Sequence, residues 1–285
     1  MNFTDLEENK KQFRILLSGM MEMPESIKGT KIEGDYLKLQ DAESIYKKTI
    51  NHCISIYHLI GESEVPEFGI RILDYSSIRI LTRAVHEAVL VFYYLFIDPT
   101  TIDEENFRYY IYSLNEAVKL LDMPFETIDK EMKKAWRDDK KDVIDKCTKT
   151  LKANSLYKEL KEKSKKKLLD GKRNWRPSWA EMGEKAGLRE LHAKWNYSLL
   201  CGDAHSSSFS LLQVRGIQSL VDRHFSVVAD LQVLMILMTK QIKFYSRVFN
   251  PATKFLESKE NKELRNVMEI WDYIGSEEIA KPVRD

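Results

Sequence analysis

Apolar residues recur along most of the chain at spacings of three and four, which is the period of amphipathic helices. Over 41–60, Ile45, Ile50, Ile54 and Tyr57 approximate one apolar face. Asn-Gly or Asp-Gly pairs flanked by alternating residues, which favour hairpins, are missing, so few strands are expected. The pattern predicts an all-α protein with a connecting loop over 61–69, one or two helices within 126–169, and further helices over 6–21, 41–60, 74–97, 104–121, 179–187, 188–201, 217–248 and 261–274.

The helix predicted over 74–97 is apolar on nearly every side, which indicates a buried position. It ends at Asp98-Pro99, because proline disfavours helical backbone in the residue before it. We therefore expect a multi-helix bundle with this helix at its centre.

A lysine-rich stretch interrupts the bundle pattern. Residues 130–173 hold 17 Lys and Arg against 8 Asp and Glu, although the formal net charge of the whole chain is only +1. Such runs are usually solvated helix faces, and the alternative is a surface that attracts nucleic acid through phosphate contacts. We expect one domain, 1–285, made of N-terminal helices (1–69), central helices (70–125), a lysine-rich helical excursion (126–173) and C-terminal helices (174–285).

The sequence favours a cytoplasmic location. The first residues are polar and acidic, unlike the start of a signal peptide. The longest apolar run, 88–97, is far shorter than the roughly 20 residues that a membrane-spanning helix needs. Cys53, Cys147 and Cys201 are far apart in the sequence and are expected to be free thiols.

The sequence contains no Gly-rich phosphate loop and no GxGxxG pattern. No histidine stands three residues after a glutamate, as the ligands of di-iron helical bundles do, and HExxH and Cys/His clusters are also missing. We expect neither a metal ion nor another cofactor.

The middle of the predicted central helix carries a group of titratable side chains, those of Arg79, Arg83, His86 and Glu87. At about 100° per residue they fall at roughly 0°, 40°, −20° and 80°, which places them on one face of the helix. A buried unpaired charge is unfavourable by several kcal/mol or more, so these groups need partners or a ligand. One interpretation is a set of internal ion pairs, with Arg83 bound to Glu87. The other is a phosphate or carboxylate site, since guanidinium groups bind both in bidentate fashion.

The segment 174–208 is the second unusual feature of the sequence. It contains three of the five tryptophans and ends in a hydroxyl-rich turn with Asp203 and His205. This turn is either a helix cap with a satisfied histidine or part of a site.

The arginine-rich central helix with Glu87, followed by Tyr197, Ser198 and His205, resembles uncharacterised bacterial helical proteins, the domain of unknown function family 5677. The resemblance covers roughly 70–238 and is interrupted by the lysine-rich stretch. It implies that the Arg79, Arg83 and Glu87 face and His205 belong to one site.

Arg79 and His86 are separated by six residues, which also resembles the Arg-x(4 to 6)-His pattern of the HEPN superfamily. Ile80 departs from that pattern, in which the residue after the arginine is usually polar. Many HEPN proteins are metal-independent ribonucleases that work as dimers. The resemblance implies that Arg79 holds the scissile phosphate and that His86 is a general acid or base.

These patterns lead to one leading hypothesis and two alternatives. The leading hypothesis is an RNA-binding or RNA-cleaving protein, a homodimer that acts as a bacterial toxin or antiviral effector. Its catalytic residues would be Arg79, His86 and His205, and its substrate-binding or orienting residues would be Arg83, Glu87, Asp203 and Tyr197. The alternatives are a non-catalytic module that binds a protein partner and a sensor of a small molecule or nucleotide, each with a structural cluster of buried charges.

Overall fold

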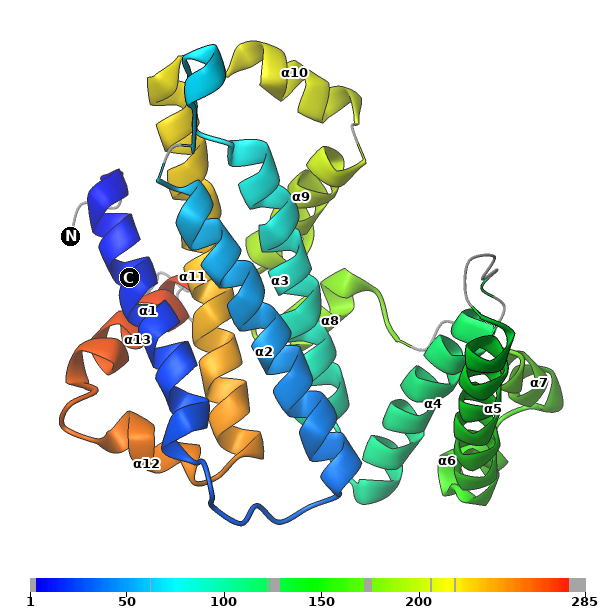
Figure 1. Ribbon diagram of the computed structural model, residues 1–285. Coiled ribbons are helices and arrows are strands. Elements are labelled where there is room, and N and C mark those ends of the chain that lie inside the picture. Colours follow the sequence, from blue (N-terminus) through cyan, green and yellow to red (C-terminus); the bar gives the residue numbers. More distant parts are fainter. Residues whose placement is uncertain are drawn as a thin grey trace, which may run out of the picture. The chain divides into compact units, whose positions relative to one another are not determined.

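The computed structural model describes residues 4–61, 63–121, 123, 129–171, 176–205, 207–217 and 219–276. Helices dominate this part of the chain, which confirms the all-α class (Figure 1). A short antiparallel pair, β1 (Ser63–Val65) and β2 (Ile70–Ile72), surrounds the 3₁₀ turn Pro66–Phe68 where a loop was expected. Residues 124–128 and 172–175, at the two ends of the expected lysine-rich excursion, lie outside the described residues.

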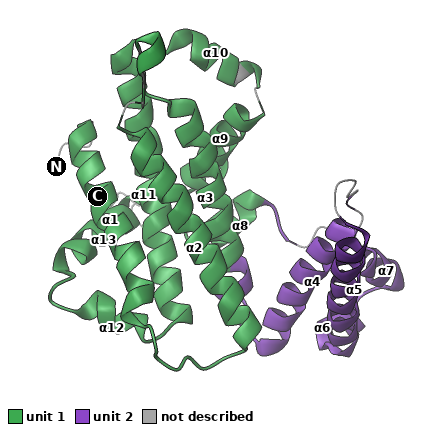
Figure 2. Ribbon diagram, in the orientation of Figure 1, with its two compact units in different colours: residues 1–93, 179–285 green, residues 94–178 purple. Residues whose placement is uncertain are grey.

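The chain divides into two compact units, residues 1–93 with 179–285 (unit 1) and residues 94–178 (unit 2), as Figure 2 shows. The excursion expected over 126–173 lies within unit 2, which begins earlier in the chain. The helices of unit 1 are α1 (Leu6–Ser26), α2 (Tyr36–Leu59), α3 (Tyr75–Phe96), α8 (Trp179–Lys185), α9 (Tyr197–Ala204), α10 (Ser208–Gly216), α11 (Leu220–Val248), α12 (Ala252–Glu257) and α13 (Lys262–Gly275), and the last three residues of α3 belong to unit 2. The helices of unit 2 are α4 (Ile102–Leu121), α5 (Lys130–Ala153), α6 (Ser155–Lys158) and α7 (Glu162–Leu169).

Unit 1 is a bundle whose most fully buried helix is α11. This helix contacts α1, α2 and α13, and it begins with a capping box between Ser219 and Asp222. It is long and apolar enough to cross a membrane, but 83% of its most apolar window is buried, as in the core helix of a soluble protein. The expected central helix, α3, is buried on one side only. Its Ile78 is fully buried, whereas its Ile80 is exposed.

The segment that leads into the site contains a sharp helix end and a change of helix type. Gly187 follows α8 with a φ of 75°, and the bonds from Leu188 N to Gly183 O and from Gly187 N to Glu184 O form a Schellman motif. The helix predicted over 179–187 thus ends at a glycine with left-handed backbone. A π-helix over Leu191–Asn196 then continues directly into α9, so the region expected to be one helix changes type within its length.

Unit 2 has a core of its own. Its α4 packs along α5, and the buried side chains come from α4, α5, α6 and α7. The core consists of Ile111, Leu114, Cys147, Leu151, Tyr157 and Leu168. Gly171 ends the unit's last helix with a φ of 65°, as expected for a glycine that breaks a helix.

Candidate functional site

The charged residues of α3 and its histidine lie along the boundary between the buried and exposed sides of the helix. His86 is completely buried, and the exposed fraction of the side chain then rises from 11% for Arg79 to 22% for Arg83 and 31% for Glu87. This order follows their angular positions around the helix, from roughly −20° to 80°. The four residues therefore divide into an inner part, Arg79 and His86, and an outer part, Arg83 and Glu87.

Arg79 joins α3 to three other helices through its side chain. Its Nε donates to Asp230 Oδ2 on α11 at 3.1 Å, and its Nη2 donates to Ser226 Oγ at 2.6 Å. Its Nη1 donates to Asp203 Oδ2 on α9 at 3.2 Å and to Gln213 Oε1 on α10 at 2.8 Å. Because two carboxylates already surround one guanidinium, Arg79 has little capacity left to attract an anion.

Asp230 is the most strongly perturbed carboxyl group of this cluster. Burial raises the pKa of Asp230 to about 7, and the charge of Asp203 adds to the rise, while Arg79 opposes it. Asp203 and Asp230 share one arginine, so holding both in the charged form is unfavourable.

We predict that Asp230 makes the protein less stable as the pH rises from about 4 to about 7. The folded pKa of about 7 exceeds the usual value of 3.8, so between these values the folded state binds a proton that the unfolded state releases. The contribution is on the order of a few kcal/mol. His86 has the opposite slope, because burial lowers its pKa to about 4 and its contribution to stability is lost as the pH falls.

Urea unfolding of the wild type and Asp230→Asn at pH 5, 6, 7 and 8 isolates this effect. The asparagine can still accept a hydrogen bond from Arg79 but cannot titrate. The stability of the wild type relative to the variant should decrease with rising pH. A difference that stays constant across the four pH values would contradict the assignment.

The outer part forms a second cluster with α9 that we call the rim cluster: Arg83, Glu87, Tyr197 and His205. Arg83 Nε and Tyr197 Oη each donate to Glu87 Oε1 at 2.9 Å. Arg83 Nη1 lies 3.3 Å from His205 Nε2, and the imidazole is exposed. Arginine can only donate, so His205 Nε2 is the acceptor of this bond.

Two properties of Tyr197 fix the rim cluster. Burial, followed by hydrogen bonds to Cys201 and Glu87, raises the pKa of Tyr197, so the phenol keeps its proton and donates to Glu87. Its ring lies 5.2 Å from the ring of His86 and 5.8 Å from that of Trp179. Tyr197 therefore connects the buried and exposed parts of the α3 face.

His86 is buried behind this ring, and neither of its nitrogens has a hydrogen-bond partner that meets ordinary geometry within the described part of the chain. Its lowered pKa keeps it neutral at physiological pH. Thus the structure brings His205 to the α3 face at Arg83, and it places His86 inside the protein.

Sequence reasoning missed three partners of Arg79: Gln213, Ser226 and Asp230. Of these three, Asp230 alone could have been found from the sequence, because a carboxylate within the apolar run of α11 also requires a partner. The described residues contain no group of three or more His, Cys, Asp or Glu side chains arranged to hold a metal ion.

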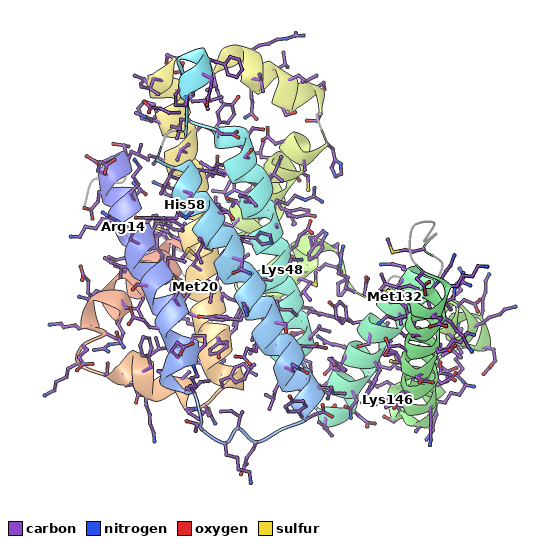
Figure 3. The ribbon with its side chains drawn as sticks, in the orientation of Figure 1. Arg14, Met20, Lys48, His58, Met132 and Lys146 are labelled. Atoms are coloured by element: carbon purple, nitrogen blue, oxygen red, sulfur yellow. The ribbon has the colours of Figure 1, made fainter. Side chains whose placement is uncertain are left out.

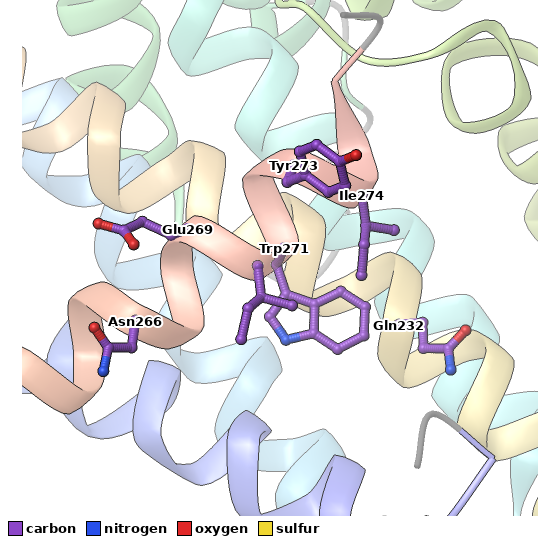
Figure 4. Close-up of a pocket in the computed structure, with 7 residues that line it drawn as sticks. Gln232, Asn266, Glu269, Trp271, Tyr273 and Ile274 are labelled. Carbon is purple, nitrogen blue, oxygen red and sulfur yellow. The ribbon is translucent and has the colours of Figure 1, made fainter. Parts of the chain in front are cut away.

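A pocket of about 750 Å³ lies on α11 and α13 and shares no residue with the charged clusters (Figure 4). Its wall includes Trp271, which is buried and donates to Gln12 Oε1 at 2.8 Å, and the exposed Tyr273. This pocket is therefore separate from the rim cluster.

A protein-family model described as a family of unknown function (DUF5677) matches residues 44–219. The match includes α3 and α9, which carry the rim cluster, and ends just before α11. No curated protein and no solved structure matches the chain.

Proposed function

The chain belongs to the family of unknown function DUF5677, and we propose that it binds RNA at the rim cluster and cleaves it without a metal ion. The observation that carries this proposal is the contact between His205 and Arg83. An exposed imidazole lies 3.3 Å from a guanidinium that is held in place by Glu87. This pair offers a proton acceptor beside a permanent positive charge, which are the groups that phosphodiester cleavage requires.

In the proposed reaction, an RNA phosphate binds the Nη side of Arg83 and competes with His205 for its donors. His205 Nε2 is then free to accept the proton of the ribose 2′-hydroxyl. The 2′-oxygen forms a bond to the adjacent phosphorus, and the bond from phosphorus to the 5′-oxygen breaks. Water protonates the leaving 5′-oxygen, and His205 returns its proton to water. Arg83 stabilises the negative charge that develops on the phosphate oxygens.

The remaining residues would position these two groups. Glu87 and Tyr197 fix the Arg83 side chain, while Arg79 and Asp203 fix the end of α9 that carries His205. This assignment moves phosphate binding from Arg79 to Arg83, because Arg79 already has two carboxylate partners. His86 would act through the Tyr197 ring instead of touching the substrate.

The test is incubation of the purified protein with a fluorescent single-stranded RNA in excess EDTA. We expect fragments that end in a 2′,3′-cyclic phosphate, and an identical deoxyribose strand should stay intact because it lacks the attacking hydroxyl. Intact RNA at protein concentrations that saturate binding would refute the proposal. So would equal cleavage of both strands, since the 2′-hydroxyl would then have no role.

We extend the proposal to a role as a bacterial toxin or antiviral effector in the cytoplasm, because a ribonuclease that cuts RNA of any sequence would damage its own cell.

A second candidate function is protein binding, in which the proposed partner is a second copy of this chain. It is favoured by exposed apolar side chains on α10 and the first turns of α11, namely Leu211, Leu212, Val214, Leu220, Val221 and Phe225. The cleavage assay separates the candidates, because a binding module leaves RNA intact.

A further inference from the structure

The last helix of unit 2 presents a face composed of lysines. In α7, Lys163, Lys166 and Lys167 are all exposed, whereas Leu168 on the opposite side is fully buried in the core of unit 2. Their spacing of three and four places the three ammonium groups within about 100° of helix surface. We call these three residues the α7 lysine face.

These lysines differ from their neighbour Lys165. Lys165 Nζ pairs with Glu162 at 2.8 Å and lies 5.8 Å from the centre of the Tyr157 ring, so it is bound to its own unit. Within the described residues, the lysines of the α7 lysine face have no ion-pair partner. Between 158 and 167 the chain has six lysines and two glutamates, and one of these glutamates is the partner of Lys165.

The three positive charges of this face repel one another. Like charges three and four residues apart destabilise a helix by roughly 0.2–0.5 kcal/mol per pair. The α7 lysine face contains two such pairs, Lys163 with Lys166 and Lys163 with Lys167. An anion with several closely spaced charges would remove this repulsion, and a nucleic-acid backbone is such an anion.

We propose that the α7 lysine face binds the backbone of single-stranded RNA and so recruits the substrate of the ribonuclease. The choice of RNA among polyanions rests on the proposed function. A helix of eight residues is only about 12 Å long, so its lysines reach two or three successive phosphates. Tyr157, the one aromatic residue of α6 and α7, is buried and unavailable for base stacking. Recognition therefore depends on phosphates and not on base sequence.

The α5 helix supplies a matched control. Its Lys134, Lys141 and Lys146 are also exposed, but they stand seven and five residues apart, so no two of them form a like-charge pair at a spacing of three or four (Figure 3 labels Lys146). Replacing three lysines by glutamine on either helix changes the net charge by the same amount. A difference between the two triple variants therefore reports on position and not on total charge.

The experiment measures binding of the full chain to a fluorescent 2′-O-methyl RNA, which cannot be cut by its own 2′-oxygen, at several salt concentrations. We expect Lys163→Gln/Lys166→Gln/Lys167→Gln to weaken binding at 100 mM salt by about tenfold or more. The slope of log K against log salt should fall by roughly 2, at about 0.7 for each lost phosphate contact. Lys134→Gln/Lys141→Gln/Lys146→Gln should change the affinity less than threefold.

Thermal unfolding of both variants checks the fold, and the α7 variant should stay close to the wild type in stability, because the lost repulsion offsets the lost interaction of Lys166 and Lys167 with the C-terminal end of the helix. Equal affinities for the two triple variants would refute the α7 lysine face as the RNA site. Because this RNA analogue tests binding alone, the proposal survives if the protein does not cleave RNA. Conversely, the cleavage assay can succeed if the α7 lysine face does not bind.

Discussion

Replacing His205 by alanine should lower the rate of RNA cleavage by about 10²–10⁴-fold, which is the usual contribution of a general acid or base. The imidazole is the exposed proton acceptor of the rim cluster, and the loss removes the group that takes the 2′-hydroxyl proton. Substrate binding should change little, because Arg83 remains held by Glu87 at 2.9 Å. The measurement is the single-turnover cleavage rate in EDTA, with RNA affinity measured separately.

Stability should hardly change in the same variant. His205 is exposed, and within the described residues its side chain is hydrogen-bonded to Arg83 alone, so we expect the small effect of a surface substitution, about ±0.5 kcal/mol. His58→Ala is the matched control, because His58 is an exposed histidine at the end of α2, outside the rim cluster. Equal cleavage rates for the wild type and His205→Ala would exclude His205 as the proton acceptor. A rate loss of the same size in His58→Ala would show that the assay does not report on this site.

Periodicity predicted the long helices well, because each must bury one apolar face. The predicted bounds 74–97 agree with α3 to within one residue at each end, and 261–274 agrees equally well with α13. Short elements were missed where the pattern has too few turns to show a period, as with α12 and α10. The π-helix before α9 cannot be seen in a sequence at all, since its side-chain pattern resembles that of an α-helix over one turn.

Helical geometry predicted which residues of the candidate site lie side by side on α3. The positions on one turn of helix placed Arg83 beside Glu87, and the resemblance to the family of unknown function implied that His205 belongs to the same site. The same geometry could not tell which side of this face is turned inward, because that depends on the packing of α9 and α11. As a result, the sequence did not show that His86 and Arg83 differ in burial. His86 is fully buried, whereas the side chain of Arg83 reaches the surface.

Arg79→Ala should destabilise the protein by about 3–5 kcal/mol, the usual effect of removing one partner from a buried ion pair. The substitution leaves Asp203 and Asp230 buried without their common cation, and it also removes donors to Gln213 and Ser226. Three helices lose their bonds to Arg79 at once. The end of α9 that carries His205 should therefore loosen, and cleavage should fall together with stability.

Further variants separate the contribution that the charge of Arg79 makes to stability from the contribution of its side-chain shape. Arg79→Lys keeps the charge but cannot reach four acceptors on three helices, so it should recover only part of the lost stability. Arg79→Leu combined with Asp203→Asn and Asp230→Asn removes all three charges, and it should be more stable than Arg79→Ala because no buried carboxylate is left unpaired. The destabilisation by Arg79→Ala should also be smaller at pH 5 than at pH 8, since the pKa of Asp230 is already about 7 and its neutral form needs no cation.

Urea unfolding of these variants at pH 5 and pH 8 measures the free energy of unfolding directly. A structural role predicts the order wild type, Arg79→Lys, Arg79→Ala at pH 8, with the gap between the first and the last narrowing at pH 5. If Arg79 instead binds the substrate phosphate, Arg79→Ala should keep most of its stability and lose RNA cleavage. The four hydrogen-bond partners of Arg79 in the folded protein favour the first result, because a guanidinium already bound by two carboxylates must give up those bonds before it can hold a phosphate.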